Sequence, residues 1–153
     1  MIRSLGQSLE SFISGWFKVP AYSIILLRDE GYPCVFYGDF YGIPHDNIQP
    51  IEELKTLIYL RKEKAYGNQT DYLDNPNYIG WTREGDEEHI NSGLAVIISN
   101  AGDGEKRMYI GKKFQGQEFI DTIGNCEDII TIDEEGFGNF KVKGNSISIW
   151  IEK

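Results

Sequence analysis

The stretch Gly31-Tyr-Pro-Cys-Val-Phe-Tyr-Gly-Asp39 decides the fold predicted for this chain. Cys34 to Tyr37 is a short apolar, aromatic and β-branched run, and Pro33 suits the first position of a strand, where the ladder needs no amide. The run therefore predicts a strand buried on both faces. It lies between two helical patterns, Gln7 to Arg28 and Ile51 to Tyr66, and this order of helix, strand, loop and helix is typical of an α/β sheet or barrel.

Apolar spacing supports both flanking helices. The first reads from Ser8 onward, with Trp16 and Phe17 expected in the core and Pro20 expected to kink or interrupt the helix. In the second, Pro50 suits the first helical position and Gly67 follows as a cap. The second helix carries a single apolar stripe, as a helix in the outer ring of a barrel would.

From Gly67 onward the pattern changes to short runs with a period of two, separated by Gly, Asn and Asp. Seven strands are predicted: Tyr78 to Arg83, Leu94 to Ser99, Arg107 to Gly111, Glu118 to Ile123, Ile129 to Asp133, Phe137 to Val142 and Ser146 to Ile151. Asn100 to Gly104 and Val142 to Ser146 are predicted as hairpin loops. Such a series predicts an antiparallel sandwich. We therefore predict two domains, residues 1–66 and residues 67–153.

Three segments together resemble the final third of the bacterial α-amylases of the liquefying or cytoplasmic type. They are the strand motif itself, Gly6-Gln7-Ser8-Leu9-Glu10-Ser11, and Gly80-Trp81-Thr82-Arg83-Glu84-Gly85-Asp86 with Asn91-Ser92-Gly93-Leu94-Ala95. The resemblance runs from Gly6 to the C-terminus. It implies an α+β fragment: the last α/β segments of a TIM (β/α)8 barrel, followed by an antiparallel Greek-key β-sandwich as the C-terminal domain.

Composition limits the partners of the chain. Its formal charge is −9, with 7 basic and 8 acidic side chains in residues 1–66 but 8 and 16 in residues 67–153, so no electrostatic footprint for nucleic acid is present. The apolar run Ala21 to Leu27 is far shorter than the roughly 20 residues of a membrane span. Cys34, in the expected buried strand, and Cys126, in a polar turn, have no metal-site spacing and are expected to be free thiols in a reducing compartment.

No residue of this chain is predicted to be catalytic. Glycoside hydrolysis needs two carboxyl groups about 5 to 9.5 Å apart. The resemblance implies that these acids come from earlier barrel strands, and that a third, in an Asn-His-Asp segment, precedes Gly6-Gln7, where this chain has Met1 to Leu5. In a barrel the loop after a strand carries the active site, so Asp39, Tyr41 and His45 are the candidate substrate-binding residues. His45 beside Asp46 also fits a solvated pair.

No metal site and no cofactor are predicted in the chain itself. Some secreted members of the resembled family bind calcium between barrel and C-terminal domain, through acids near the positions of Asn77 and Asn100 here. Two neutral amides would remove most of the charge of such a site. The acid runs Asp86-Glu87-Glu88 and Asp133-Glu134-Glu135 are expected to face water.

The resemblance implies the C-terminal part of a cytoplasmic bacterial hydrolase that cleaves internal α-1,4 links of starch, glycogen or maltodextrins. Its partners would be the α-glucan or maltooligosaccharide and the upstream barrel portion, and alone it would be inactive. Two alternatives remain. One is a non-catalytic module that binds α-glucan through Trp81, Tyr109 and Trp150, although these rings also fit a sandwich core. The other is a structural module that completes a separately expressed barrel piece.

Overall fold

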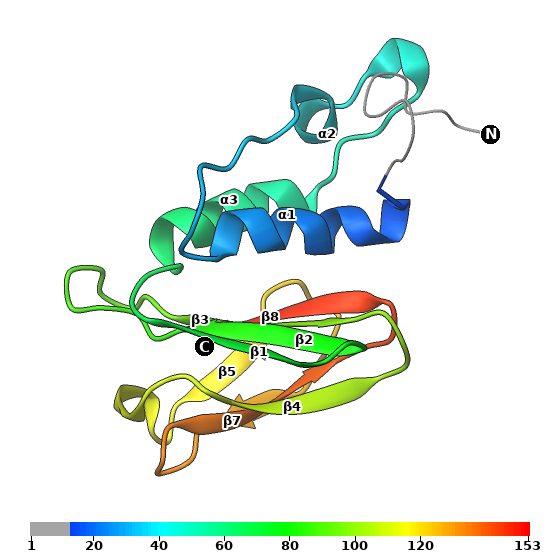
Figure 1. Ribbon diagram of the computed structural model, residues 1–153. Coiled ribbons are helices and arrows are strands. Elements are labelled where there is room, and N and C mark those ends of the chain that lie inside the picture. The colour runs from blue at the N-terminus through cyan, green and yellow to red at the C-terminus, as the bar shows by residue number, and fades with distance from the viewer. Residues whose placement is uncertain (1–12) are drawn as a thin grey trace.

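The computed structural model describes residues 13–153, which form three layers (Figure 1). Helices α1 (Lys18–Leu27) and α3 (Glu53–Glu63) lie side by side across one face of a six-stranded sheet. A two-stranded sheet covers the opposite face. The central sheet therefore buries apolar side chains on both sides. None of the helices within residues 13–153 combines the length and apolar character needed to cross a bilayer.

Both long helices are shorter than their sequence patterns. A 3-10 turn, η1 (Gly15–Phe17), leads into α1, and Pro20 lies in the first turn of that helix. A missing amide costs no helical hydrogen bond there, so Pro20 is accommodated at the helix start and does not break the helix. The predicted start at Ser8 lies outside the described residues. The second predicted helix forms, with Leu54, Leu57 and Leu60 of α3 as its buried stripe. Its predicted ends are wrong, because the helix is capped by Glu52 and Lys64 and not by Pro50 and Gly67.

The predicted strand at Cys34 to Tyr37 is wrong. Residues 32–36 carry no strand pairing, and a short helix, α2 (Tyr37–Tyr41), begins where the strand was expected to end. A parallel strand needs a neighbouring strand to complete its ladder, and none of the strands in the described part of the chain pairs with this segment. Cys34 and Phe36 are accordingly exposed, not buried.

All seven predicted strands form, although several differ from prediction at their ends. The described strands are β1 (Gln69–Asn75), β2 (Tyr78–Arg83), β3 (Leu94–Ser99), β4 (Gly104–Tyr109), β5 (Glu118–Asp121), β6 (Ile129–Thr131), β7 (Phe137–Val142) and β8 (Ser146–Glu152). The larger sheet has the order β1-β2-β3-β8-β5-β6, the smaller pairs β4 with β7, and every pairing between these described strands is antiparallel. The strand β1 was not predicted.

The two predicted hairpin loops are instead crossings between sheets. Asn100 to Gly104 leads from β3 in the larger sheet to β4 in the smaller, and Val142 to Ser146 leads from β7 back to β8. The reason lies in β3, whose two edges are already paired with β2 and β8. The chain that leaves β3 has no free edge to fold back on, so it passes to the other layer.

The central strand β3 carries the core in both directions, because every residue of Leu94 to Ser99 is buried. Leu94, Val96 and Ile98 pack with the leucines of the helical layer, whereas Ala95 and Ile97 pack with the residues between the two sheets. The helices are thus fixed to the sandwich by the same strand that organises it.

Candidate functional site

The first predicted binding residue, Asp39, is a buried anchor between α2 and α1. Only 4% of Asp39 is exposed. The ammonium group of Lys18 lies 2.6 Å from its Oδ1, and the hydroxyl of Tyr22 donates a 2.7 Å hydrogen bond to its Oδ2. The Phe36 amide donates in turn to the Tyr22 oxygen at 3.3 Å. The carboxylate therefore holds the segment before α2 against α1.

This anchor changes the acidity of Tyr22. Burial, and then the hydrogen bond to the Asp39 carboxylate, raise the pKa of the Tyr22 phenol from 10.0 to about 12. A raised pKa means that the folded protein holds this proton more tightly than the unfolded chain does. The stabilisation from this group is therefore complete below pH 10 and is lost as the pH rises toward about 12.

We expect Tyr22 to be among the last of the nine tyrosines to ionise in an alkaline titration of the folded protein followed at 295 nm. Tyr22→Phe should remove the highest-pKa component and leave the rest of the curve in place. Tyr32→Phe is the matched control, because Tyr32 is almost fully exposed. If the titration curve of Tyr22→Phe instead lacked a tyrosine of ordinary pKa, the buried contact of Tyr22 with Asp39 would be contradicted.

The other two predicted binding residues lie on the outside of the same segment. Tyr41, at the end of α2, is mostly exposed, with its ring centre 4.6 Å from that of Tyr37. His45 lies in the 3-10 turn η2 (Pro44–Asp46), with 80% of its side chain exposed and its Nε2 3.4 Å from Asp46 Oδ2. The structure thus places Asp39 with Lys18 and Tyr22, while Tyr41 and His45 face solvent. Lys18 and Tyr22 were missed, although their i, i+4 spacing puts them on one face of a helix.

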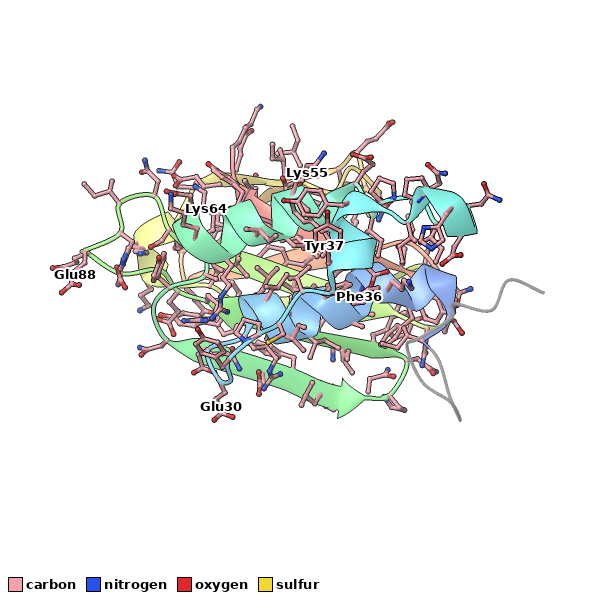
Figure 2. All side chains as sticks on the ribbon, turned by 90° about the horizontal axis from the view of Figure 1, so that it is seen from above. Glu30, Phe36, Tyr37, Lys55, Lys64 and Glu88 are labelled. Atoms are coloured by element: carbon pink, nitrogen blue, oxygen red, sulfur yellow. The ribbon has the colours of Figure 1, made fainter. Side chains whose placement is uncertain are left out.

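Exposed aromatic and aliphatic side chains collect on the helical side of the molecule. We call the following set the outer aromatic surface: Trp16, Ile25, Tyr32, Phe36, Tyr37 and Tyr41. Figure 2 shows Phe36 and Tyr37 on the side of the helical layer that faces away from the sheets. The prediction of Trp16 as a core residue is wrong, because 44% of it is exposed, whereas Phe17 packs against the core.

The rings proposed as a sugar platform do not form one. Trp81 and Trp150 are fully buried, Trp81 beneath the helices and Trp150 between the two sheets, and Tyr109 stacks edge-on against Phe137. A buried indole offers no face to a pyranose ring. The alternative of glucan binding through Trp81 and Trp150 is therefore wrong for this fold.

The two asparagines near which the resemblance implies a calcium site are poor ligands for that ion. Asn77 and Asn100 lie at one end of the sheet, where the Asn100 amide group donates to the Pro76 carbonyl at 3.4 Å and the Asn77 carbonyl accepts the Asn100 backbone amide at 3.2 Å. Neither residue brings a carboxylate, which calcium prefers. Within residues 13–153, no group of three or more His, Cys, Asp and Glu side chains is arranged to hold a metal ion.

Both cysteines differ from their expected surroundings. Cys34 is exposed, outside any strand, and Cys126 is buried between the sheets, with its Sγ 3.4 Å from the Ser148 hydroxyl. The two thiols are free, as predicted.

Comparison with known sequences identifies the relatives of this chain. The family described as "Alpha-amylase C-terminal" matches residues 94–151, which run from β3 to β8. The α-amylase of Geobacillus stearothermophilus is 50% identical over 97% of this chain and 27% of its own length. The glucan 1,4-alpha-maltohexaosidase of Bacillus sp. (strain 707) is 47% identical over 96% of this chain and 29% of its own length. The cytoplasmic α-amylase of Escherichia coli (strain K12) is 37% identical over 95% of this chain and 31% of its own length.

Solved structures share the fold. The crystal structure of an Anoxybacillus α-amylase overlays with a TM-score of 0.59, at 15% identity, over 85% of this chain and 30% of that one. The gamma-CGTase from alkalophilic Bacillus clarkii gives 0.55, at 18% identity, over 86% of this chain and 22% of that one. This chain thus spans less than a third of the length of each of these relatives and solved structures. From its motifs, its sandwich and its relatives, the chain belongs to the bacterial α-amylase family and corresponds to the C-terminal part of its members.

Proposed function

We propose that this chain is the C-terminal part of a glycoside hydrolase that cleaves internal α-1,4 links of starch, glycogen or maltodextrins. In this proposal residues 1–66 are the last segments of the (β/α)8 barrel and residues 67–153 are the C-terminal domain. The names and identities of the relatives support the activity of the complete enzyme. The activity of this chain then depends on the upstream barrel portion.

The observation that carries the proposal is the outer aromatic surface. Tyr32 and Tyr37 are largely in contact with water and Phe36 is nearly half exposed. Exposed apolar clusters of this kind usually mark an interface. Residues 32–36 are an unpaired extended segment on the same side of the helices. A neighbouring barrel strand would complete the missing ladder and bury the rings together. The predicted strand at Cys34 to Tyr37 would then form only in the complete barrel.

The chemistry assigned to this chain is positioning and not bond cleavage. The buried carboxylate of Asp39 is engaged by Lys18 and Tyr22, which suits a support for the loop more than a proton donor. Tyr41 and His45, exposed on the segment after it, are proposed to edge the sugar cleft of the complete enzyme. The acid/base and nucleophilic carboxylates would come from upstream strands.

Cytoplasmic localisation, without a cofactor held by this chain, completes the proposal. The cytoplasmic relative in Escherichia coli and the two free thiols, one of them exposed, are consistent with a reducing compartment.

We expect the purified chain alone to release no reducing sugar from starch. A mixture of the chain with the Geobacillus stearothermophilus α-amylase that lacks the matched segment should release reducing sugar. Association should bury the outer aromatic surface, so Phe36→Asp and Tyr37→Asp should each weaken the complex at least about ten-fold, because a charge would then be desolvated at an interface. Reducing-sugar release and the concentration for half-maximal activity measure this.

Ile129→Asp provides the matched control, because Ile129 is equally apolar and half exposed but lies on β6, at the far edge of the sheet. It should leave complementation unchanged. Hydrolysis of starch by the rigorously purified chain alone would refute the proposal that the cleaving carboxylates come from the upstream barrel portion. Equal effects of Ile129→Asp and Tyr37→Asp would refute the assigned interface.

A further inference from the structure

A strongly basic pocket lies between the end of α1, the end of α3 and β2, on a protein whose net charge is −9. It is open to solvent and has a volume of about 520 Å³. Its charged lining consists of Arg28, Arg61, Lys62 and Arg83, against the single acid Asp29. Four positive groups and one negative group leave an excess of three positive charges. Such an excess is the opposite of what the composition predicts for an average patch of this surface.

Arg83 is the most constrained of these groups. Only 7% of the residue is exposed, and its Nε donates a 3.2 Å hydrogen bond to the Gly67 carbonyl. Within residues 13–153 its two terminal nitrogens have no hydrogen-bond partner. Burial lowers the pKa of Arg83, and the charge of Arg61 adds to that shift, whereas the charges of Asp29 and, to a smaller extent, Asp86 oppose it. A buried guanidinium beside a second one is poorly compensated unless an anion lies between them.

Arg61 is held in a similar way from the opposite wall. Its Nη1 donates a 2.6 Å hydrogen bond to the Leu26 carbonyl at the end of α1, while Nε and Nη2 have no partner in the described part of the chain. Arg28 is different, because its Nη2 is 2.7 Å from Asp71 and its guanidinium lies 5.8 Å from the centre of the Trp81 ring. Arg61 and Arg83 are therefore the two preformed donors of the pocket.

We propose that this pocket is a binding site for a small tetrahedral oxyanion of the phosphate class, held by Arg61 and Arg83. Two fixed guanidinium groups present several N–H donors in rigid forks, which match the oxygens of a phosphate. Lys62 adds a largely exposed positive charge to the lining, with its ammonium 3.6 Å from Glu63 Oε1. Asp29 would compete with the anion, because its singly charged carboxylate lines the same pocket and already attracts Arg83.

We expect calorimetric titration of the full chain with inorganic phosphate, at fixed ionic strength, to show one saturable site. Arg61→Gln and Arg83→Lys should each weaken binding about ten-fold or more, the first by removing a charge and the second by removing the fork. Asp29→Asn should tighten binding several-fold by removing the competitor. Arg107→Gln, on β4 and away from the pocket, is the matched control and should bind as the unmodified chain does.

Acetate and chloride at the same ionic strength separate the ligand classes. If acetate binds as tightly as phosphate, the assignment to a tetrahedral oxyanion is refuted. If Arg107→Gln and Arg83→Lys weaken binding equally, or if no saturable site is found, the pocket is refuted. Circular dichroism shows whether each variant is folded. If Arg83→Lys does not fold, the phosphate affinity of Arg61→Gln tests the proposal.

Discussion

Asp121→Ala is expected to lower the free energy of unfolding by about 3 to 5 kcal/mol, because it strands several buried amides at once. The carboxylate is 8% exposed and lies at the end of β5. Its Oδ1 accepts the backbone amides of Ile123 at 3.1 Å and Ile149 at 2.9 Å, and its Oδ2 accepts those of Asn125 and Cys126 at 3.0 Å each. One side chain thus ties the loop after β5 to β8. Urea unfolding followed by far-UV circular dichroism measures the loss.

Asp121→Asn distinguishes the hydrogen-bond role from simple volume. The amide keeps one acceptor oxygen, but its NH₂ would face two backbone N–H donors, so we expect it to recover less than half of the loss. Asp128→Ala is the matched control, because Asp128 forms an exposed pair with Lys141 and such pairs contribute about 0 to 1 kcal/mol. Equal destabilisation by the two alanine variants would contradict the assigned role of Asp121.

Two runs of the sequence have the pattern of a buried strand, and only one of them forms a strand. Leu94 to Ser99 and Cys34 to Tyr37 are both short runs rich in apolar and β-branched residues. Only the first is paired, because β2 and β8 supply its two edges within the described chain. Local sequence indicates whether the side chains of a run suit the buried faces of a sheet. Whether the run becomes a strand also depends on whether a neighbouring strand is present to pair with its edge.

The strand β1 is the opposite case, because it forms although its sequence lacks the pattern of a strand. Gln69 to Asn75 is polar, with Asp71 and Asp74 in its middle, and it lies at the edge of the larger sheet. An edge strand packs little of its surface, so apolar alternation is weak there. Its neighbour β2 pairs with it from Gln69 to Asn75 with an irregularity after Tyr72, which sequence periodicity alone would not reveal.

The candidate site could be predicted only in part for the same reason. The loop position of Asp39, Tyr41 and His45 followed from the order of elements, but the fate of each side chain depends on packing across the chain. Lys18 is 21 residues from the carboxylate that it neutralises. Arg61 and Arg83, which line the basic pocket, come from a helix and a strand in the two halves of the sequence. Long-range convergence of this kind leaves no local pattern.

Trp150→Ala is expected to cost about 3 to 5 kcal/mol of folding free energy, the usual range for removing a fully buried large aromatic side chain. The indole packs near Phe140 between the two sheets, and its Nε1 donates a 3.1 Å hydrogen bond to the Lys141 carbonyl. Truncation opens a cavity in the centre of the sandwich and leaves that carbonyl without its donor. The unfolding midpoint in urea, measured by circular dichroism, should fall accordingly.

This result decides how any loss of starch binding by a Trp150 variant should be understood. If the indole supports the core, retardation in starch-containing gels should fall only as far as the folded fraction falls, and Trp150→Phe should restore much of both. Tyr59→Ala is the matched control, because Tyr59 is an exposed ring on α3, outside the segment proposed to edge the sugar cleft, and its removal leaves the core intact. If Trp150→Ala kept the stability of the unmodified chain but lost starch retardation, the ring would be a binding surface and its place between the sheets would be refuted. If Tyr41→Ala lost retardation at full stability, that loss would support the proposed place of Tyr41 at the edge of the sugar cleft.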